Sequence, residues 1–223
     1  MQQAYVKYPV RDYFETFTGD LTGLSILDYG CNHANFLRYK SFAGFYTGLD
    51  ILPNIIECNK NQYPEHKWLL LDKFNYQYRN EHVEEKWPKL EKYDYALAYS
   101  VFTHTDEKEF IDTVKKLKEH STSVLATFIS TKDKQSLVKI FKHRPEYFVD
   151  PESLADQILN RVSVYIACSN TKTCVNSIPN KTEYYLHFYN DDYISNKLNA
   201  EVVRPNDNFT NVMSVQRLLV IWY

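Results

Sequence analysis

The chain has 223 residues, a length that suits one domain with room for an insertion. Hydrophobic residues make up 44% and charged residues 24%, a composition that supports a packed core and excludes a disordered chain. The formal net charge is −2 with both signs interspersed, so the basic surface that neutralises nucleic-acid phosphates is not evident. We therefore expect a small-molecule partner rather than a nucleic acid.

Targeting and metal-binding signals are missing from the sequence. Its start lacks a basic segment followed by an apolar one, so we expect no secretory signal. No apolar run approaches the ~20 residues that span a bilayer, and we predict no membrane partner. The four cysteines form no CxxC pair and no Cys/His set at zinc spacing, so we predict no metal. These features favour a cytoplasmic protein and leave its oligomeric state open.

Apolar strand candidates alternate with helical patterns through the first 130 residues. Such alternation predicts an α/β fold with a parallel sheet covered by helices on both faces. The predicted strands are Leu24–Tyr29, Phe45–Ile51, Trp68–Asp72, Tyr93–Ser100 and Ser123–Ser130. The predicted helices are Asn35–Phe42, Pro53–Gln62, a weaker one near Glu81–Lys89, and Asp106–Glu119, where Asp106 and Glu109 form a capping-box-like start.

The alternation breaks after Ser130. Residues 131–183 contain two helical patterns followed by a polar, Asn/Thr-rich stretch. An excursion this long inside a compact domain is usually functional, so we interpret it as a lid and acceptor-binding insertion, with a plain structural excursion as the alternative. The two helical patterns and the later strand, helix and two strands are Lys134–Lys142, Glu152–Asn160, Tyr184–Tyr189, Asp191–Leu198, Glu201–Arg204 and Val215–Trp222.

The stretch Ile-Leu-Asp-Tyr-Gly-Cys-Asn-His-Ala-Asn-Phe, residues 26–36, is the most informative. Its apolar strand ends at Asp28 and turns at Gly30, where the backbone can approach a ligand closely. At the carboxyl end of a parallel strand such a turn forms a ligand crevice. Asp50 ends the next strand about 20 residues later, and a carboxylate there can accept both ribose hydroxyls. The alternative role for Asp50 is a helix N-cap before Pro53.

Two histidines are candidates for proton transfer. His104 follows the strand Tyr93–Ser100 at the mouth of the expected crevice, and the ordinary imidazole pKa of about 6.5 suits a base near neutral pH. We predict that His104 is the general base or orients the acceptor; packing against a cofactor or capping the next helix is the alternative. His187 is a second catalytic candidate, placed by strand alternation on the face opposite Leu186 and Phe188. A role in the core is equally compatible with His187.

These segments resemble the class I, Rossmann-like S-adenosylmethionine-dependent methyltransferases of the small-molecule type. The first motif of that family, Asp-x-Gly-x-Gly-x-Gly, corresponds to Asp28, Gly30, Asn32 and Ala34. Asn best tolerates a positive φ and Ala is the smallest alternative, whereas the pyrophosphate of a nicotinamide cofactor needs glycine at such positions. The segment Ser-Val-Phe-Thr-His, which ends at His104, is similar to the fourth-strand segment of these enzymes. Order and spacing match over residues 24–130.

The resemblance implies a Rossmann-like three-layer sandwich. Its mostly parallel seven-stranded sheet would contain one antiparallel strand, with a helical or loop insertion before the last strands. The implied division is an N-terminal cap segment, a cofactor-binding core, the insertion or lid, and C-terminal strands that complete the sheet: residues 1–23, 24–130, 131–183 and 184–223.

The resemblance also implies S-adenosylmethionine as cofactor and S-adenosylhomocysteine as product. In the family, a side chain at the position of Asp72 contacts the adenine amino group, and Phe74 would line the ring. The implied cofactor-binding residues are Asp28, Gly30, Asn32, Asn35, Phe36, Asp50, Ile51, Asp72, Lys73, Phe74, Ser100, Val101 and Phe102.

The function that the resemblance implies is O-methylation of a sugar or similar small polar metabolite. Similar enzymes act in bacterial capsule, lipopolysaccharide or secondary-metabolite pathways. Two alternatives remain: a methyltransferase for RNA or protein, and a catalytically inert cofactor-binding module, which the two lost glycines suggest.

Overall fold

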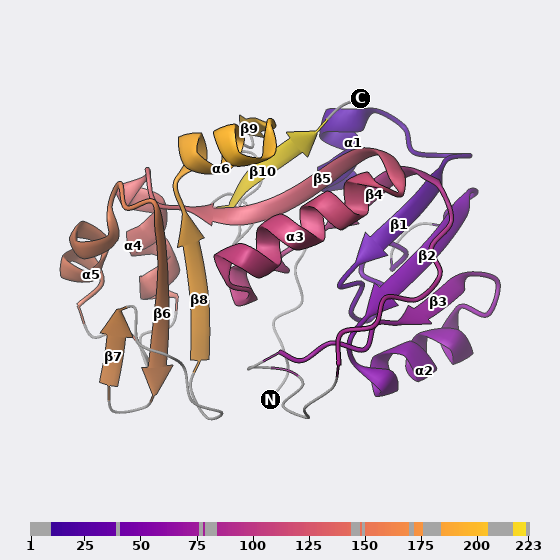
Figure 1. Cartoon of the computed structure of the whole chain (residues 1–223), viewed down its shortest axis with the longest axis horizontal. Helices are drawn as coiled ribbons and strands as arrows, with labels where there is room; N and C mark the ends of the chain where they lie inside the picture. The colour runs from indigo at the N-terminus through magenta and orange to yellow at the C-terminus, as the bar shows by residue number, and fades with distance from the viewer. Residues whose placement is uncertain are drawn as a thin grey trace.

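The computed structural model describes residues 10–38, 41–75, 78, 84–143, 148, 150–169, 172–175, 184–204 and 216–221 (Figure 1). Its helices are α1 Val10–Thr18, α2 Pro53–Gln62, the 3₁₀ helix η1 Phe102–His104, α3 Glu107–Lys118, α4 Lys134–Lys142, α5 Pro151–Ile158 and α6 Asp191–Leu198. Its strands are β1 Ser25–Tyr29, β2 Phe45–Asp50, β3 Lys67–Leu70, β4 Tyr93–Ala98, β5 Ser121–Ser130, β6 Ser163–Ser169, β7 Lys172–Val175, β8 Tyr184–Tyr189, β9 Glu201–Val203 and β10 Gln216–Ile221. None of these helices combines the length and the apolar character that crossing a bilayer requires.

Seven of the strands form the core of the sheet, in the order β3-β2-β1-β4-β5-β10-β9. Neighbours from β3 to β5 pair in parallel, whereas β10 is antiparallel to both β5 and β9. The prediction of a mostly parallel seven-stranded sheet with one antiparallel strand is confirmed. Strands buried on both faces read as continuous apolar runs, which is why the sequence located them.

Three further strands extend the sheet from the end of β5. Strand β8 pairs in parallel with β5 at Ile129↔Phe188 and Ser130↔Tyr189, and β6 and β7 follow in antiparallel pairs. Ile129 also pairs with Gln216 of β10, so β8 and β10 lie on opposite edges of β5. Strands β6 and β7 fall in the stretch whose polar composition predicted no regular structure.

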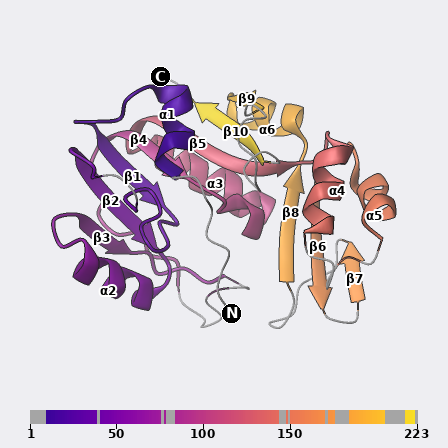
Figure 2. The same cartoon turned by 180° about the vertical axis from the view of Figure 1, so that it is seen from behind.

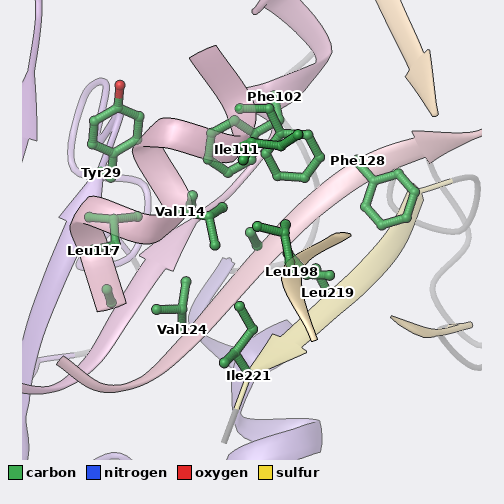
Figure 3. Packing of buried hydrophobic residues seen from close by; sticks show 14 of the residues in the cluster. Tyr29, Phe102, Ile111, Val114, Leu117, Val124, Phe128, Leu198, Leu219 and Ile221 are labelled. Atoms are coloured by element: carbon green, nitrogen blue, oxygen red, sulfur yellow. The ribbon is translucent and has the colours of Figure 1, made fainter. Parts of the chain in front are cut away.

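Helices cover both faces of the core sheet, which confirms the three-layer arrangement (Figures 1 and 2). Leu27 and Ile26 of β1 point to opposite faces, as alternation requires. Leu27 packs in the cluster that includes α3 and α6, and Ile26 packs in the cluster that includes α1 and α2. Figure 3 shows the first of these clusters, in which side chains of α3 face those of the strands; its labelled members include Ile111, Val114, Leu117, Val124, Leu219 and Ile221.

The predicted insertion, residues 131–183, shares a hydrophobic core with strand β8, which the sequence assigned to the C-terminal strands; from here on the insertion includes β8. Helices α4 and α5 pack on β6 and β8 through buried side chains such as Phe141, Ile158, Val164 and Phe188. Figure 1 shows these elements together at one end of the molecule, with β5 running from the core sheet towards them. The insertion is therefore a second packing unit joined to the first through β5.

Two predicted helices are wrong. In the predicted helix Asn35–Phe42, residues 35–38 continue a series of turns that starts at residue 32, where Asn32 and Ala34 have left-handed φ values of 47° and 50°; residues 39–40 lie outside the described part. Residues 84–89 of the predicted helix near Glu81–Lys89 form no helix, and Lys86 forms a β-bridge with Asp72; residues 81–83 lie outside the described part. Helix α1, within the predicted N-terminal cap segment, was not expected.

Candidate cofactor and active site

The turn after β1 depends on Gly30. Its φ is 72°, a left-handed value that strains any residue with a Cβ. The N–H groups of Gly30 and Cys31 both donate to the Leu49 carbonyl of β2, at 2.8 and 3.2 Å. A Cβ at Gly30 would lie 2.5 Å from Cγ2 of Val101, so the turn also needs the space. Glycine therefore lets the loops after β1 and β4 meet.

The two residues that replace the motif glycines keep the backbone path of a glycine. Asn32 and Ala34 both have left-handed φ values, which the sequence predicted for Asn32. Ala34 is fully buried, and its side chain is the smallest alternative to glycine. Two hydrogen bonds fix Asn32: its N–H donates to Oδ2 of Asp50 at 3.0 Å, and its carbonyl accepts from Nδ2 of Asn59 at 2.6 Å. The loss of glycine has not closed this turn.

Asp50 ends β2 beside the same turn. Oδ2 accepts from Asn32 N–H, and Oδ1 accepts from Leu52 N–H at 3.0 Å. Burial raises the pKa of this carboxyl, and the backbone donors oppose the rise. The N-cap of α2 is Leu52, so the alternative of a helix cap at Asp50 is wrong.

Asp28, at the end of β1, is nearly fully buried. Oδ2 accepts a hydrogen bond from the Tyr46 hydroxyl at 2.6 Å. Burial raises the pKa of Asp28 to about 7; the Tyr46 hydrogen bond opposes this rise and the nearby Asp50 adds to it. The carboxyl therefore changes charge near neutral pH.

The loop after β4 is anchored at its start. Ser100 has a left-handed φ of 57°, and its N–H donates to Oγ1 of Thr127 in β5 at 2.8 Å. The following η1 turn buries Phe102, whose ring stacks on Phe110 of α3 with centroids 4.2 Å apart. These contacts fix the backbone that leads to His104.

His104 closes the η1 turn. Its carbonyl accepts from Nδ2 of Asn75, which follows β3, at 3.1 Å. Its ring meets the Tyr78 ring edge-on, with centroids 5.4 Å apart. The side chain is only partly buried and borders the cavity described next.

A cavity of about 270 Å³ lies among these groups. Its charged lining consists of the carboxyl groups of Asp28, Asp50 and Glu109, and no described Lys or Arg lines it. Within the described ranges no group of three or more His, Cys, Asp or Glu side chains is placed to hold a metal ion. The predicted site residues that line the cavity are Asp28, Gly30, Asn32, Asn35, Asp50, Ile51, Ser100, Val101 and His104.

No model of a protein family matches the chain, and no curated protein matches its sequence. Solved structures do match. The magnesium protoporphyrin IX methyltransferase of Synechocystis PCC 6803 with bound S-adenosylhomocysteine has a TM-score of 0.52 and 12% identity, covering 94% of this chain and 79% of that one. The glycopeptide N-methyltransferase MtfA has a TM-score of 0.56 and 10% identity over 96% and 89% of the two chains. A Pyrococcus horikoshii OT3 protein has a TM-score of 0.56 and 12% identity, over 95% and 86%.

This chain has the fold of the S-adenosylmethionine-dependent methyltransferases. The fold that the sequence predicted is thus confirmed. Of the matched methyltransferases, the Synechocystis enzyme was crystallised with S-adenosylhomocysteine, and MtfA with sinefungin and with S-adenosylhomocysteine. At 10–12% identity the likeness concerns the fold.

Six predicted site residues do not line the cavity of this methyltransferase fold. Phe36 stacks on Tyr46 in the core, with ring centroids 5.5 Å apart. His187 is buried with Nε2 2.7 Å from Oγ of Ser163. Phe102 packs in the hydrophobic cluster that includes α3 and α6. Asp72 forms a backbone β-bridge with Lys86. The six residues are Phe36, Asp72, Lys73, Phe74, Phe102 and His187.

Glu109 is the charged lining residue that the sequence did not single out. Its carboxyl lies 3.4 Å from Nζ of the buried Lys73, which is also 3.4 Å from Glu85. Burial raises the pKa of Glu109 to about 7, and Lys73 opposes the rise. The sequence assigned Glu109 only to the helix start, where its N–H donates to Asp106 at 2.7 Å. The sequence signal that could have identified Glu109 as a lining residue is its position in the first turn of α3, shortly after His104.

Proposed function

We propose that the chain is an S-adenosylmethionine-dependent methyltransferase that binds its cofactor in the cavity beside Gly30 and Asp50. The observation that carries the proposal is the turn at Gly30 and the Asp50 carboxylate facing one cavity at adjacent strand ends. The carboxyl lining supports it, because the cofactor carries an ammonium and a sulfonium cation whereas a pyrophosphate would be repelled. The sequence argument against a nicotinamide cofactor points the same way.

Asp50 suits the ribose role. Its oxygens accept backbone hydrogen bonds from Asn32, Leu52 and Ile51, and a carboxylate offers about four lone-pair sites in all. The remaining lone-pair site can therefore accept a hydrogen bond from a ribose hydroxyl. The backbone donors hold the carboxylate in place before any ligand arrives.

His104 suits the acceptor side. When bound, S-adenosylmethionine supplies an electrophilic methyl group. The cavity aligns the reactants, a contribution of ~7–11 kcal/mol in well-oriented reactions. His104 takes the proton from the attacking hydroxyl, a contribution of roughly 10²–10⁴-fold. We infer O-methylation of a sugar or another small polar metabolite in the cytoplasm, with residues 131–183 covering the acceptor.

Calorimetric titration with S-adenosylhomocysteine tests the cofactor site. We expect Asp50→Ala to weaken binding by about tenfold or more, because charge-assisted hydrogen bonds contribute roughly 1.5–3 kcal/mol. Asp112→Ala is the matched control, since this exposed carboxylate pairs with Lys108 on the outer side of α3. Equal affinity of Asp50→Ala and wild type would remove Asp50 from the site, and no binding by wild type would overturn the proposal.

Transfer of a labelled methyl group to a panel of sugars, phenols, proteins and RNA tests the reaction. We expect transfer to a small hydroxylated acceptor and a 10²–10⁴-fold loss of turnover in His104→Ala, with cofactor affinity nearly unchanged. Wild-type turnover should fall at low pH as the base is protonated. Transfer to RNA or protein alone would contradict the acceptor class, and binding without any transfer would favour the inert module.

A further inference from the structure

Strand β8 presents two different faces. Leu186 and Phe188 belong to the hydrophobic core of the insertion. On the other face the rings of His187 and Tyr189 stack, with centroids 4.3 Å apart and planes 3° from parallel. Oγ of Ser163 in β6 lies 2.7 Å from Nε2 of His187. The second face thus carries a stacked pair of rings, one of which is hydrogen-bonded to β6.

The same pair of rings contacts the loop that carries His104. The Tyr189 hydroxyl donates to the Thr105 carbonyl at 2.9 Å, and both residues are buried. A hydrogen bond also joins the His187 ring to the Thr105 backbone. Thr105 lines the cavity and directly follows His104. The insertion therefore contacts the site through backbone one residue from the proposed base.

The His104 segment is held from two directions. Asn75, from the core, donates to the carbonyl of His104, and Tyr189, from the insertion, donates to the next carbonyl along the chain. Burial lowers the pKa of His187 to about 4, so its ring stays neutral across the pH range in which His104 would act. Strand β8 therefore supports the loop through a His187 ring that does not change charge near neutral pH.

We propose that Tyr189 is a positioning residue for His104 and that β8 thereby makes the insertion part of the active site. The inference rests on the proposed function, which assigns the base role to His104. Loss of the Tyr189 hydroxyl removes one of the two hydrogen bonds that β8 makes to the Thr105 backbone, so the loop is held less firmly beside His104. A misplacement of about 1 Å at a reacting group can cost about 10²-fold in rate.

The test compares two tyrosines that each donate a hydroxyl hydrogen bond near the start of α3. Tyr189→Phe keeps the ring and its stacking but removes the bond to Thr105. Tyr193→Phe is the matched control, because the Tyr193 hydroxyl donates to Glu107 and does not contact the loop carbonyl. We expect Tyr189→Phe to lower kcat about tenfold, to leave S-adenosylhomocysteine affinity within about twofold, and to shift the imidazole NMR signals of His104. Tyr193→Phe should change none of these.

Unchanged kcat together with unchanged His104 signals in Tyr189→Phe would overturn the inference. Equal losses of kcat in both tyrosine variants would also overturn it, because they would indicate general destabilisation. Failure of the proposed function gives a different result. If His104→Ala keeps full turnover, His104 is not the base. The NMR signals then still decide whether Tyr189 positions His104.

Discussion

Single backbone and side-chain positions decide whether this cavity can hold a charged ligand. Gly30 keeps two loops in contact, and Asn32 and Ala34 retain left-handed backbone without being glycine. The sequence predicted these positions well, because strand ends and glycine turns have clear local signals. It misplaced Phe102, since spacing cannot tell which of two neighbours, Val101 or Phe102, turns towards the cavity. It also missed Glu109, which reaches the cavity from a helix.

Asp28 gives a prediction at this scale. Its folded-state pKa of about 7 lies above the unfolded value of 3.8, so the native state binds more protons between these two pH values. Stability therefore falls progressively as pH rises through this window, because the unfolded carboxyl ionises while the buried one keeps its proton, and the full penalty is present above it. Asp28→Asn should raise the stability relative to wild type by a few kcal/mol (~2–4) at pH 8 and much less at pH 4. Thermal unfolding at both pH values checks this; an equal difference would contradict it.

At the scale of elements, the sequence predicted best those strands and helices that bury most of their residues. The strands of the core sheet were located because apolar runs and helix periods are strong signals. Strand β7 was missed because its stretch is rich in Asn and Thr, whereas β6 contains neither residue and was missed because it borders that stretch. The helix expected over Asn35–Phe42 failed because the left-handed residues before it start a series of turns. The pattern of hydrophobicity carries no information about such backbone geometry.

Helix α3 tests the capping argument. Its N-cap Asp106 accepts from the Glu109 N–H at 2.7 Å, while the Glu109 side chain pairs with Lys73 instead of closing a capping box. Asp106→Ala should lower the free energy of unfolding by about 1 kcal/mol. Denaturant unfolding checks the value. Asp112→Ala, an exposed change in the same helix, should have an effect below about 0.5 kcal/mol, and equal losses would contradict the capping role.

At the scale of the molecule, the buried hydrophobic side chains form three separate clusters. Two lie on opposite faces of the core sheet and the third lies inside the insertion. The sequence predicted an insertion over residues 131–183 and placed β8 among the strands that complete the sheet. It did not predict that β8 would join β6 and β7 to β5, because this pairing joins segments far apart in the chain.

Phe141 probes the independence of the third cluster. It is fully buried between Phe148 and Phe188, with ring centroids 4.8 and 5.7 Å away. Phe141→Ala should cost about 3–5 kcal/mol locally, as large-to-small core changes do. Hydrogen exchange should then speed up in β6 and β8 while β1, β2 and β4 stay protected. Uniform loss of protection across the molecule would show that the two units unfold as one.

The position of β8 on β5 bears on how such a chain can acquire new chemistry. Strand β4 pairs with β5 up to Ala126, and β8 uses the length beyond it, at Ile129 and Ser130. The α4–β8 unit thus displaces no strand of the core sheet. A different unit that pairs with the same two residues would preserve every pairing of the core sheet, but it would also have to replace the contact of Tyr189 with Thr105 at the cavity.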